Sequence, residues 1–378
     1  MTWLVAKLKE YVLEPFSSWD NFRSAITGGV KAITTLEHPT GWLFLFSAIV
    51  VSFLAYHFAK KRGELEPATT FRKFIFPKEI FTHPSAVVDY KFAFLDLSLR
   101  DLLYSPLVGA VSMLVYKGVL ALTGGAAAMS PAAGRDFNDK LIFTVVTFLI
   151  ADFGFFVSHM LMHEVPLLWH FHEVHHTAEV MTPITVYRIH PVERVISTIV
   201  GGVLGGLSAA VYSYSSQNQL AGVTILGVNA LLFVFYDVVA ALRHSHVWVS
   251  YGRVLERILI SPAQHQIHHS SARKHWDKNY GFVLGIWDGI FGSLYVPRGR
   301  EHIVFGVPNT DPNDFSTVGK LYALPFKKAW RHLRYPKSVK PMVFDDAPDE
   351  SDARVAPRVP GAAAASTAPA APAVTRAN

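Results

Sequence analysis

Five long apolar stretches constrain the fold of this chain more than any other feature. Each approaches the roughly 20 residues that a helix needs to cross the hydrocarbon core of a bilayer. The chain is 51% hydrophobic and 17% charged, whereas about 25% charged residues is usual for soluble domains. We therefore predict an all-α fold, an integral membrane bundle of about four to five membrane helices. The predicted stretches are residues 42–58, 102–123, 141–163, 195–214 and 220–242.

The distribution of basic residues predicts the orientation of this bundle. Eight Lys and Arg residues lie between positions 60 and 100, whereas two lie between positions 124 and 140. Because an excess of Lys and Arg marks cytoplasmic loops, the 60–100 segment is expected inside. The histidine-rich segments after the third and fifth stretches then face the cytoplasm as well. The net charge of +6 is explained by this bias, so we expect a multi-pass membrane protein and no nucleic-acid partner.

Histidine is the residue type that carries chemistry here. The chain has no cysteine, and 13 of its 18 histidines lie between His159 and His275. His159 and His163 are one helical turn apart, a spacing that suits shared metal coordination but also arises by chance. Two triplets are more specific, because composition alone predicts each only roughly 0.04 times in a chain of this length. They are His172-x-x-His175-His176 and His265-x-x-His268-His269.

A metal site is the simplest explanation for this pattern. Histidine is costly to concentrate at a membrane face unless its polar nitrogens have partners. A bound divalent ion uses the lone pair of each imidazole and holds the ring in its neutral form. The pair, the two triplets and His244 supply nine candidate ligands. One ion cannot use nine ligands, but two ions of four to six coordination can, with positions left open for a small molecule. Imidazole suits iron, zinc, copper or nickel.

The histidine segments together resemble the membrane-bound fatty acid hydroxylase and sterol desaturase superfamily. The similar segments are SHMLMH, WHFHEVHHT, YRIHPVE, LRHSHVWVS and SPAQHQIHHS, followed by DKNYGFVLGIWDGIFGSLY, within residues 152–297. The resemblance implies a helical membrane enzyme with a cytoplasmic histidine-rich di-metal cap. The metal is normally iron, with zinc possible in the purified protein. Such an enzyme uses O2 to hydroxylate or desaturate a lipid such as a fatty acyl chain or sterol.

The resemblance also assigns metal ligands residue by residue. Met160 departs from the family, which usually has Arg after the first histidine, and His246 stands where many relatives have Asn. His190 and His246 are open between metal ligation and a structural role, and other histidines such as His170, His275 and His332 are expected to be ordinary. The assigned ligands are His159, His163, His172, His175, His176, His244, His265, His268 and His269.

Carboxylates are expected to support these ligands, because a ligating imidazole usually donates its second N–H to an acid or a carbonyl. Asp152 is the best candidate, since it lies two turns before His159 on about the same helical face. Six other acids are weaker candidates, each more often solvated or structural. They are Glu173, Glu179, Glu193, Asp237, Asp277 and Asp288.

Partners follow from the same arguments. The sequence has no dinucleotide, flavin or haem-attachment motif, so electrons are expected from an external reductase, cytochrome or ferredoxin. The substrate is expected to be a lipid that enters from the bilayer. Two non-enzymatic alternatives remain: a membrane haem protein, which needs one histidine pair per haem on facing helices, and a metal transporter, which places its ligands near the bilayer midplane.

The chain divides into four predicted parts. Residues 1–40 form an N-terminal amphipathic segment, and residues 41–300 form the membrane-embedded catalytic domain. Residues 301–344 form a basic extension, within which positions 320–340 carry seven Lys and Arg and no acid. That segment either contacts anionic headgroups or is simply solvated. Residues 345–378 are acidic and then rich in Ala and Pro, a composition that predicts a disordered tail.

Overall fold

The computed structural model describes residues 13–34, 39–99, 102, 104–123, 137–216, 224–225, 228–235 and 242–335. The first twelve residues of the predicted N-terminal amphipathic segment lie outside the described residues. The predicted tail, residues 345–378, lies outside them as well. Within the described part, the regular secondary structure is helical apart from one antiparallel pair of short strands and two isolated bridges.

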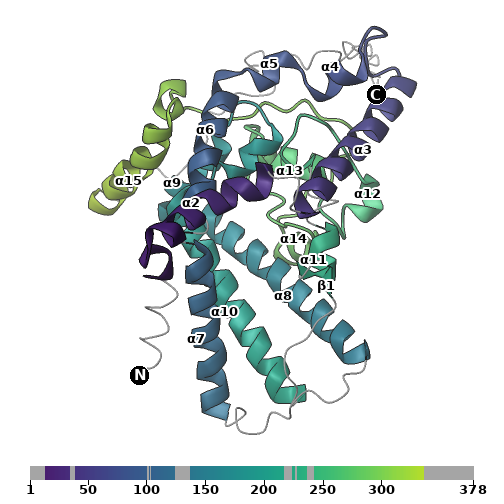
Figure 1. The fold of residues 1–378 in the computed structure, drawn as a ribbon. Helices are drawn as coiled ribbons and strands as arrows, with labels where there is room; N and C mark the ends of the chain where they lie inside the picture. The colour runs from purple at the N-terminus through teal and green to yellow at the C-terminus, as the bar shows by residue number, and fades with distance from the viewer. Residues whose placement is uncertain are drawn as a thin grey trace, which may run out of the picture.

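Three long helices form one half of the molecule. They are α7 (Ser105–Thr123), α8 (Phe137–Glu164) and α10 (Pro191–Ser216), and they occupy the lower part of Figure 1. α10 packs against both α7 and α8. Gly202 and Gly206 on α10 permit the approach to α7, because a Cβ at Gly202 would lie 2.8 Å from Val111 Cγ1 and one at Gly206 2.9 Å from Val115 Cβ. Small residues at this spacing are typical of close helix contacts in membranes.

Two of these helices are long and apolar enough to cross a membrane, namely Phe137–Glu164 and Pro191–Tyr212, and Pro106–Leu122 is a shorter apolar helix. In the most apolar 18-residue segment of each of the two longer helices, only 33% of the residues of Phe137–Glu164 and 22% of those of Pro191–Tyr212 are buried. A core helix of a soluble protein would be mostly buried, so these helices instead present apolar side chains outward. Exposed examples are Ile142, Leu149 and Phe155 on α8 and Val203, Leu207 and Val211 on α10.

The other two predicted stretches differ in outcome. Residues 42–58 lie within one helix, α3 (Pro39–Lys61). The prediction of a continuous helix over residues 220–242 is wrong for the part that is described. There β1 (Thr224–Ile225) pairs antiparallel with β2 (Val228–Asn229), and α11 (Ala230–Val234) follows. Asn229 starts α11 by accepting from the N–H groups of Leu231 and Leu232, a capping interaction that hydropathy does not detect.

The remaining elements have at most 17 residues and lie mostly around the upper ends of the long helices (Figure 1). Pro166 and Pro262 stand at the first positions of α9 and α13, where a missing N–H costs nothing. These elements are η1 (Glu14–Phe16), α2 (Trp19–Thr34), α4 (Phe71–Ile75), α5 (Lys78–Phe81), α6 (Pro84–Leu99), α9 (Pro166–His176), η4 (Pro183–Tyr187), α12 (Gly252–Leu255), α13 (Pro262–His268), η7 (Arg273–His275), α14 (Ile286–Phe291), η8 (Pro312–Phe315) and α15 (Val318–Arg334).

One buried cluster connects α9 with elements that are distant in the sequence. Phe92 of α6, Val174 of α9 and Leu321 of α15 are fully buried and pack together. Burying such side chains stabilises the fold by about 1.5–3 kcal/mol each. α9, which carries one histidine triplet, is therefore held between α6 and α15.

Candidate metal centre

The nine histidines that the sequence singled out converge from four segments. α8 ends with His159 and His163, and Pro166 then starts α9 two residues later. α13 begins with a capping box in which Ser261 and Gln264 exchange side-chain and backbone hydrogen bonds. His244 lies in the turn region that precedes α12. The rest are His172, His175 and His176 of α9, and His265, His268 and His269 at α13.

These histidines form two groups, and within each group the ligand atoms lie within 4.8 Å of one another. Each triplet is divided between both groups. The i and i+4 residues of a helix point about 40° apart, whereas the i+3 residue turns about 60° to the other side, so in each triplet it reaches the other group. The groups adjoin, since the rings of His176 and His269 stack 4.4 Å apart. The first group is His159, His163, His172, His176 and His268; the second is His175, His244, His265 and His269.

The nitrogen positions fit a transition-metal ion in each group. In the first group, His172 Nε2 lies 3.2 Å from Nε2 of both His159 and His176. In the second, His244 Nε2 lies 3.0 Å from His175 Nε2 and 2.9 Å from His265 Nε2. Ligands bound about 2.1 Å from one ion at angles of 90–109° would lie about 3.0–3.4 Å apart.

Buried nitrogens without hydrogen-bond partners point to the same fit. Within the described residues, Nε2 of His163 and Nε2 of His268 are buried and have no partner. An unpaired buried polar atom is costly, and a bound ion would use both lone pairs. The donor set, made only of imidazoles, suits iron, zinc, copper or nickel.

Contacts at the second ring nitrogens orient the imidazoles. A carbonyl oxygen can only accept, so a ring Nδ1 beside one carries the proton and leaves the Nε2 lone pair free for a metal. Two acids that the sequence marked as weaker candidates also lie nearby: Glu193 Oε1 is 2.9 Å from His172 Nδ1, and Asp277 Oδ1 is 3.5 Å from His163 Nδ1. The carbonyl contacts are His159 to Tyr280 (2.7 Å), His175 to Arg188 (3.2 Å) and His268 to Lys278 (2.8 Å).

Burial keeps the imidazoles neutral. Desolvation lowers the pKa of His268 to about 3. It also lowers the pKa of His265 well below the ordinary range, and neighbouring His244 adds to this effect. The pKa of His269 is lowered by burial and then by His176. Neutral imidazole is the form that binds metal ions.

The expectation that Asp152 supports an imidazole is wrong, because its described hydrogen bonds go elsewhere. Its buried carboxylate accepts from the N–H groups of Val283 (2.9 Å) and Leu284 (3.0 Å) and from Trp287 Nε1 (2.9 Å). Asp152 therefore fastens the segment after Tyr280 to α8. Since the Tyr280 carbonyl contacts His159, Asp152 positions that histidine indirectly, by holding the backbone segment that follows Tyr280.

Replacing Asp152 by Asn is expected to destabilise the protein by about 1–3 kcal/mol, the cost of leaving buried donors unpaired. Asn has one acceptor oxygen, and its NH2 group would face N–H donors. Thermal unfolding of the purified protein measures this loss. An unchanged unfolding temperature would contradict the role of Asp152 in fastening residues 283–287 to α8.

Two further candidates lie outside both groups. His190 Nδ1 accepts from Val192 N–H at 3.1 Å, and its Nε2 lies 3.2 Å from the Tyr322 carbonyl. His246 Nε2 lies 2.8 Å from the Phe74 carbonyl. Both histidines therefore connect backbone segments. Among the histidines expected to be ordinary, His275 pairs with Glu301 at 2.9 Å, and His170 with His332 at 3.3 Å.

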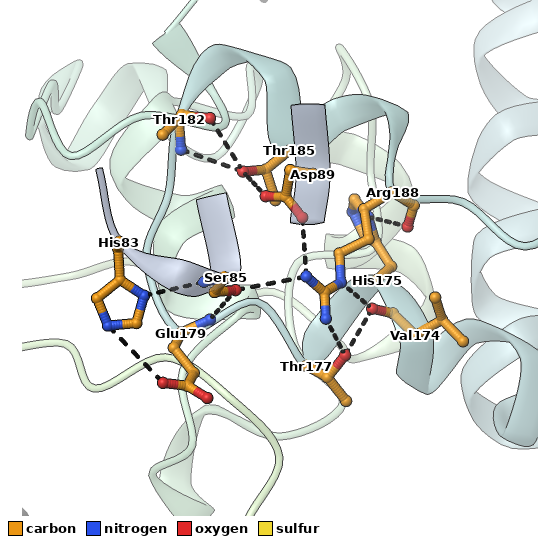
Figure 2. Close-up of polar contacts among 10 residues, drawn as sticks. All are labelled: His83, Ser85, Asp89, Val174, His175, Thr177, Glu179, Thr182, Thr185 and Arg188. Atoms are coloured by element: carbon orange, nitrogen blue, oxygen red, sulfur yellow. Dashed lines mark hydrogen bonds and ion pairs between the residues drawn. The ribbon is translucent and has the colours of Figure 1, made fainter. Parts of the chain in front are cut away.

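A buried network behind His175 was not predicted from the sequence. Arg188 is 1% exposed and donates to Asp89 Oδ1 (2.8 Å), the Val174 carbonyl (2.8 Å) and Thr177 Oγ1 (2.9 Å). Figure 2 shows these bonds and the contact between His175 and the Arg188 carbonyl. The guanidinium thus ties the end of α9 to α6. The Arg-x-His-Pro pattern drew attention to His190 rather than to Arg188, and no sequence pattern marked Asp89.

Comparison with known proteins agrees with this geometry. A family model described as fatty acid hydroxylase matches residues 144–293, which include all nine grouped histidines. No solved structure matches the chain significantly.

Three curated relatives illustrate the similarity. Human alkylglycerol monooxygenase is 32% identical over 49% of this chain, and a Rhizobium tropici ornithine lipid hydroxylase is 25% identical over 53%. A Gibberella zeae delta(7)-sterol 5(6)-desaturase is 28% identical over 41%. The aligned segment covers 36%, 56% and 42% of these relatives, respectively. Residues 144–293 therefore form a fatty acid hydroxylase domain, and this domain belongs to the fatty acid hydroxylase and sterol desaturase superfamily.

Proposed function

We propose that this chain is a membrane-embedded oxygenase that uses O2 and two iron ions to hydroxylate a lipid. The observation that carries the proposal is the pair of adjoining imidazole groups. The relatives that the chain matches are named an alkylglycerol monooxygenase, an ornithine lipid hydroxylase and a delta(7)-sterol 5(6)-desaturase. Desaturation of the same kind of substrate is the related outcome that the experiment below distinguishes.

The residues of the chain have defined tasks in this proposal. The first group would hold one ion and the second group the other, and such a pair of irons supplies the oxidising chemistry that an unactivated C–H bond requires. The carbonyls of Tyr280, Arg188 and Lys278 keep their histidines in the metal-binding tautomer. Seven of the nine histidines are buried, and this burial excludes water from their ligand atoms. A reductase, cytochrome or ferredoxin would deliver the electrons.

The proposed location is the cytoplasmic boundary of the bilayer. The outward apolar side chains of α8 and α10 suit lipid. The ligand histidines lie at the end of α8 rather than at its middle, which fits an interfacial enzyme better than a transporter. α4 and α5, which belong to the Lys- and Arg-rich 60–100 segment, lie toward the same end of the molecule (Figure 1). The positive-inside rule then places the metal centre on the cytoplasmic side.

A haem protein is a weaker explanation. A haem needs two facing imidazoles with an open plane between them. Here one group has five ring nitrogens and the other has four, and the nitrogens of each group lie within 4.8 Å of one another. This arrangement leaves no room for a macrocycle.

Expression in a host without the gene tests the proposed function. Lipid mass spectrometry is expected to reveal a product heavier by one oxygen atom, and growth under ¹⁸O2 should place the heavy isotope in that product. The His175→Ala variant should form no product. A loss of two hydrogens would indicate desaturation, whereas an unchanged lipid profile or oxygen that comes from water would contradict an oxygenase.

A further inference from the structure

The outer face of α15 carries an exposed apolar stripe. Phe326, Trp330 and Leu333 recur at helical spacing and are 54%, 65% and 63% exposed. One side of the Phe326 ring packs against Phe171 and His190. Leu321, on the face opposite Trp330, is buried where α15 packs against α9 and α6, and Ala329, between the two faces, is buried as well. An exposed aromatic stripe on an otherwise well-packed helix marks an interaction surface.

A basic stripe runs directly beside the apolar one. Lys327, Arg331 and Arg334 are exposed and lie next to it around the helix axis. α15 contains no acidic residue. Its remaining cation near α9, Lys328, is paired with Glu173 at 2.8 Å. The outer half of α15 is therefore aromatic on one side and cationic on the other.

The position of α15 in the fold indicates what covers this surface. α9 begins two residues after α8 ends, and α15 packs along α9. If α8 spans the bilayer, as the proposed function requires, α15 lies at the level where α8 leaves it. Figure 1 shows α15 beside α6 at that end of the molecule. Tryptophan favours the headgroup region, helices that lie in this interface bury phenylalanine and leucine there, and lysine and arginine attract anionic lipid.

We propose that the outer face of α15 docks on a membrane surface that contains anionic phospholipids. Phe326, Trp330 and Leu333 enter the boundary between headgroups and acyl chains, and Lys327, Arg331 and Arg334 contact lipid phosphates. An acidic electron-donor protein would complement the cations, but the adjoining apolar stripe and the level of α15 favour lipid. Because α15 also holds α9 through Lys328 and Leu321, docking fixes the height of a metal-bearing helix at the membrane.

The absence of cysteine from the chain allows a clean test. Leu333→Cys carries an environment-sensitive fluorophore in the full-length protein, reconstituted in nanodiscs. The nanodiscs contain phosphatidylcholine with or without phosphatidylglycerol, and bromine on the acyl chains near the headgroups serves as quencher. Quenching is expected to be roughly twofold stronger with phosphatidylglycerol. The combined substitutions Lys327→Glu, Arg331→Glu and Arg334→Glu should remove that difference.

A second probe separates this inference from the proposed function. Leu149→Cys on the exposed face of α8 should be quenched by bromine placed deep in the acyl chains in both lipid mixtures, and failure there would overturn the membrane span and the docking together. A quenched Leu149 probe with a Leu333 probe that responds only to aqueous iodide would overturn docking alone. Protection of the Leu333 probe only when a soluble ferredoxin is added would assign the face to a protein instead.

Discussion

Alanine at His175 or at His268 is expected to abolish lipid oxidation and to lower the amount of bound metal. The two residues belong to different groups of imidazoles, so each substitution should affect one ion first. His175 belongs to the group of four, which would keep three ligands, whereas His268 belongs to the group of five, which would keep four. The loss of metal should therefore be larger for His175→Ala. Elemental analysis of the iron-loaded, purified protein measures the metal-to-protein ratio independently of activity.

His332→Ala is the matched control for these variants. His332 contacts His170 at 3.3 Å and belongs to neither group. We expect it to retain both the metal and the activity of the unaltered chain. Full metal content in both the His175 and the His268 variants would show that the imidazole groups do not hold the ions.

The histidine spacing predicted which residues meet, but not how they are shared. Spacing within one helix shows that His172 and His176 lie on the same face. It does not show that His268, which is far away in the sequence, joins them while His265 joins His175. That division depends on how α9 and α13 approach each other, and hydrogen bonds and burial across the whole fold decide it.

Two other differences have local physical causes. Residues 220–242 are apolar enough for a helix, but Asn229 caps a new helix in their middle and bonds Thr144 and Thr147 of α8. Asp152 lies on the expected face of α8, yet three N–H donors from residues 283–287 reach it there. Periodicity places a side chain on a face, and only the tertiary fold selects its partner.

The ion pair behind His175 supports a second large effect. Asp89 is fully buried and Arg188 is 1% exposed, and Asp89 Oδ1 lies 2.8 Å from Arg188 Nη1. Asp89→Asn would leave a buried guanidinium without its counter-charge. Breaking a buried pair in this way costs about 3–5 kcal/mol, so thermal unfolding should occur at a markedly lower temperature.

Asp96→Asn provides the comparison, because Asp96, like Asp89, is an α6 residue that pairs with an arginine. Asp96 Oδ2 also lies 2.8 Å from its partner Arg194, but the Arg194 side chain is 30% exposed, so water can solvate the cation that remains. A loss of about 1 kcal/mol is expected there. Equal losses in the two variants would show that the buried position of Arg188 contributes nothing special.

The metal content of these two variants distinguishes positioning from stability. Arg188 holds the Val174 carbonyl with its side chain, and its own carbonyl contacts His175 Nδ1. If Asp89 fixes this arrangement, Asp89→Asn should weaken metal binding roughly 10–100-fold, the usual effect of losing a group that orients a ligand. Asp96→Asn should leave metal binding unchanged, because, in the described part of the chain, the Arg194 side chain donates to Asp96 rather than to a grouped histidine. Normal metal affinity in folded Asp89→Asn protein would limit Asp89 to a structural role.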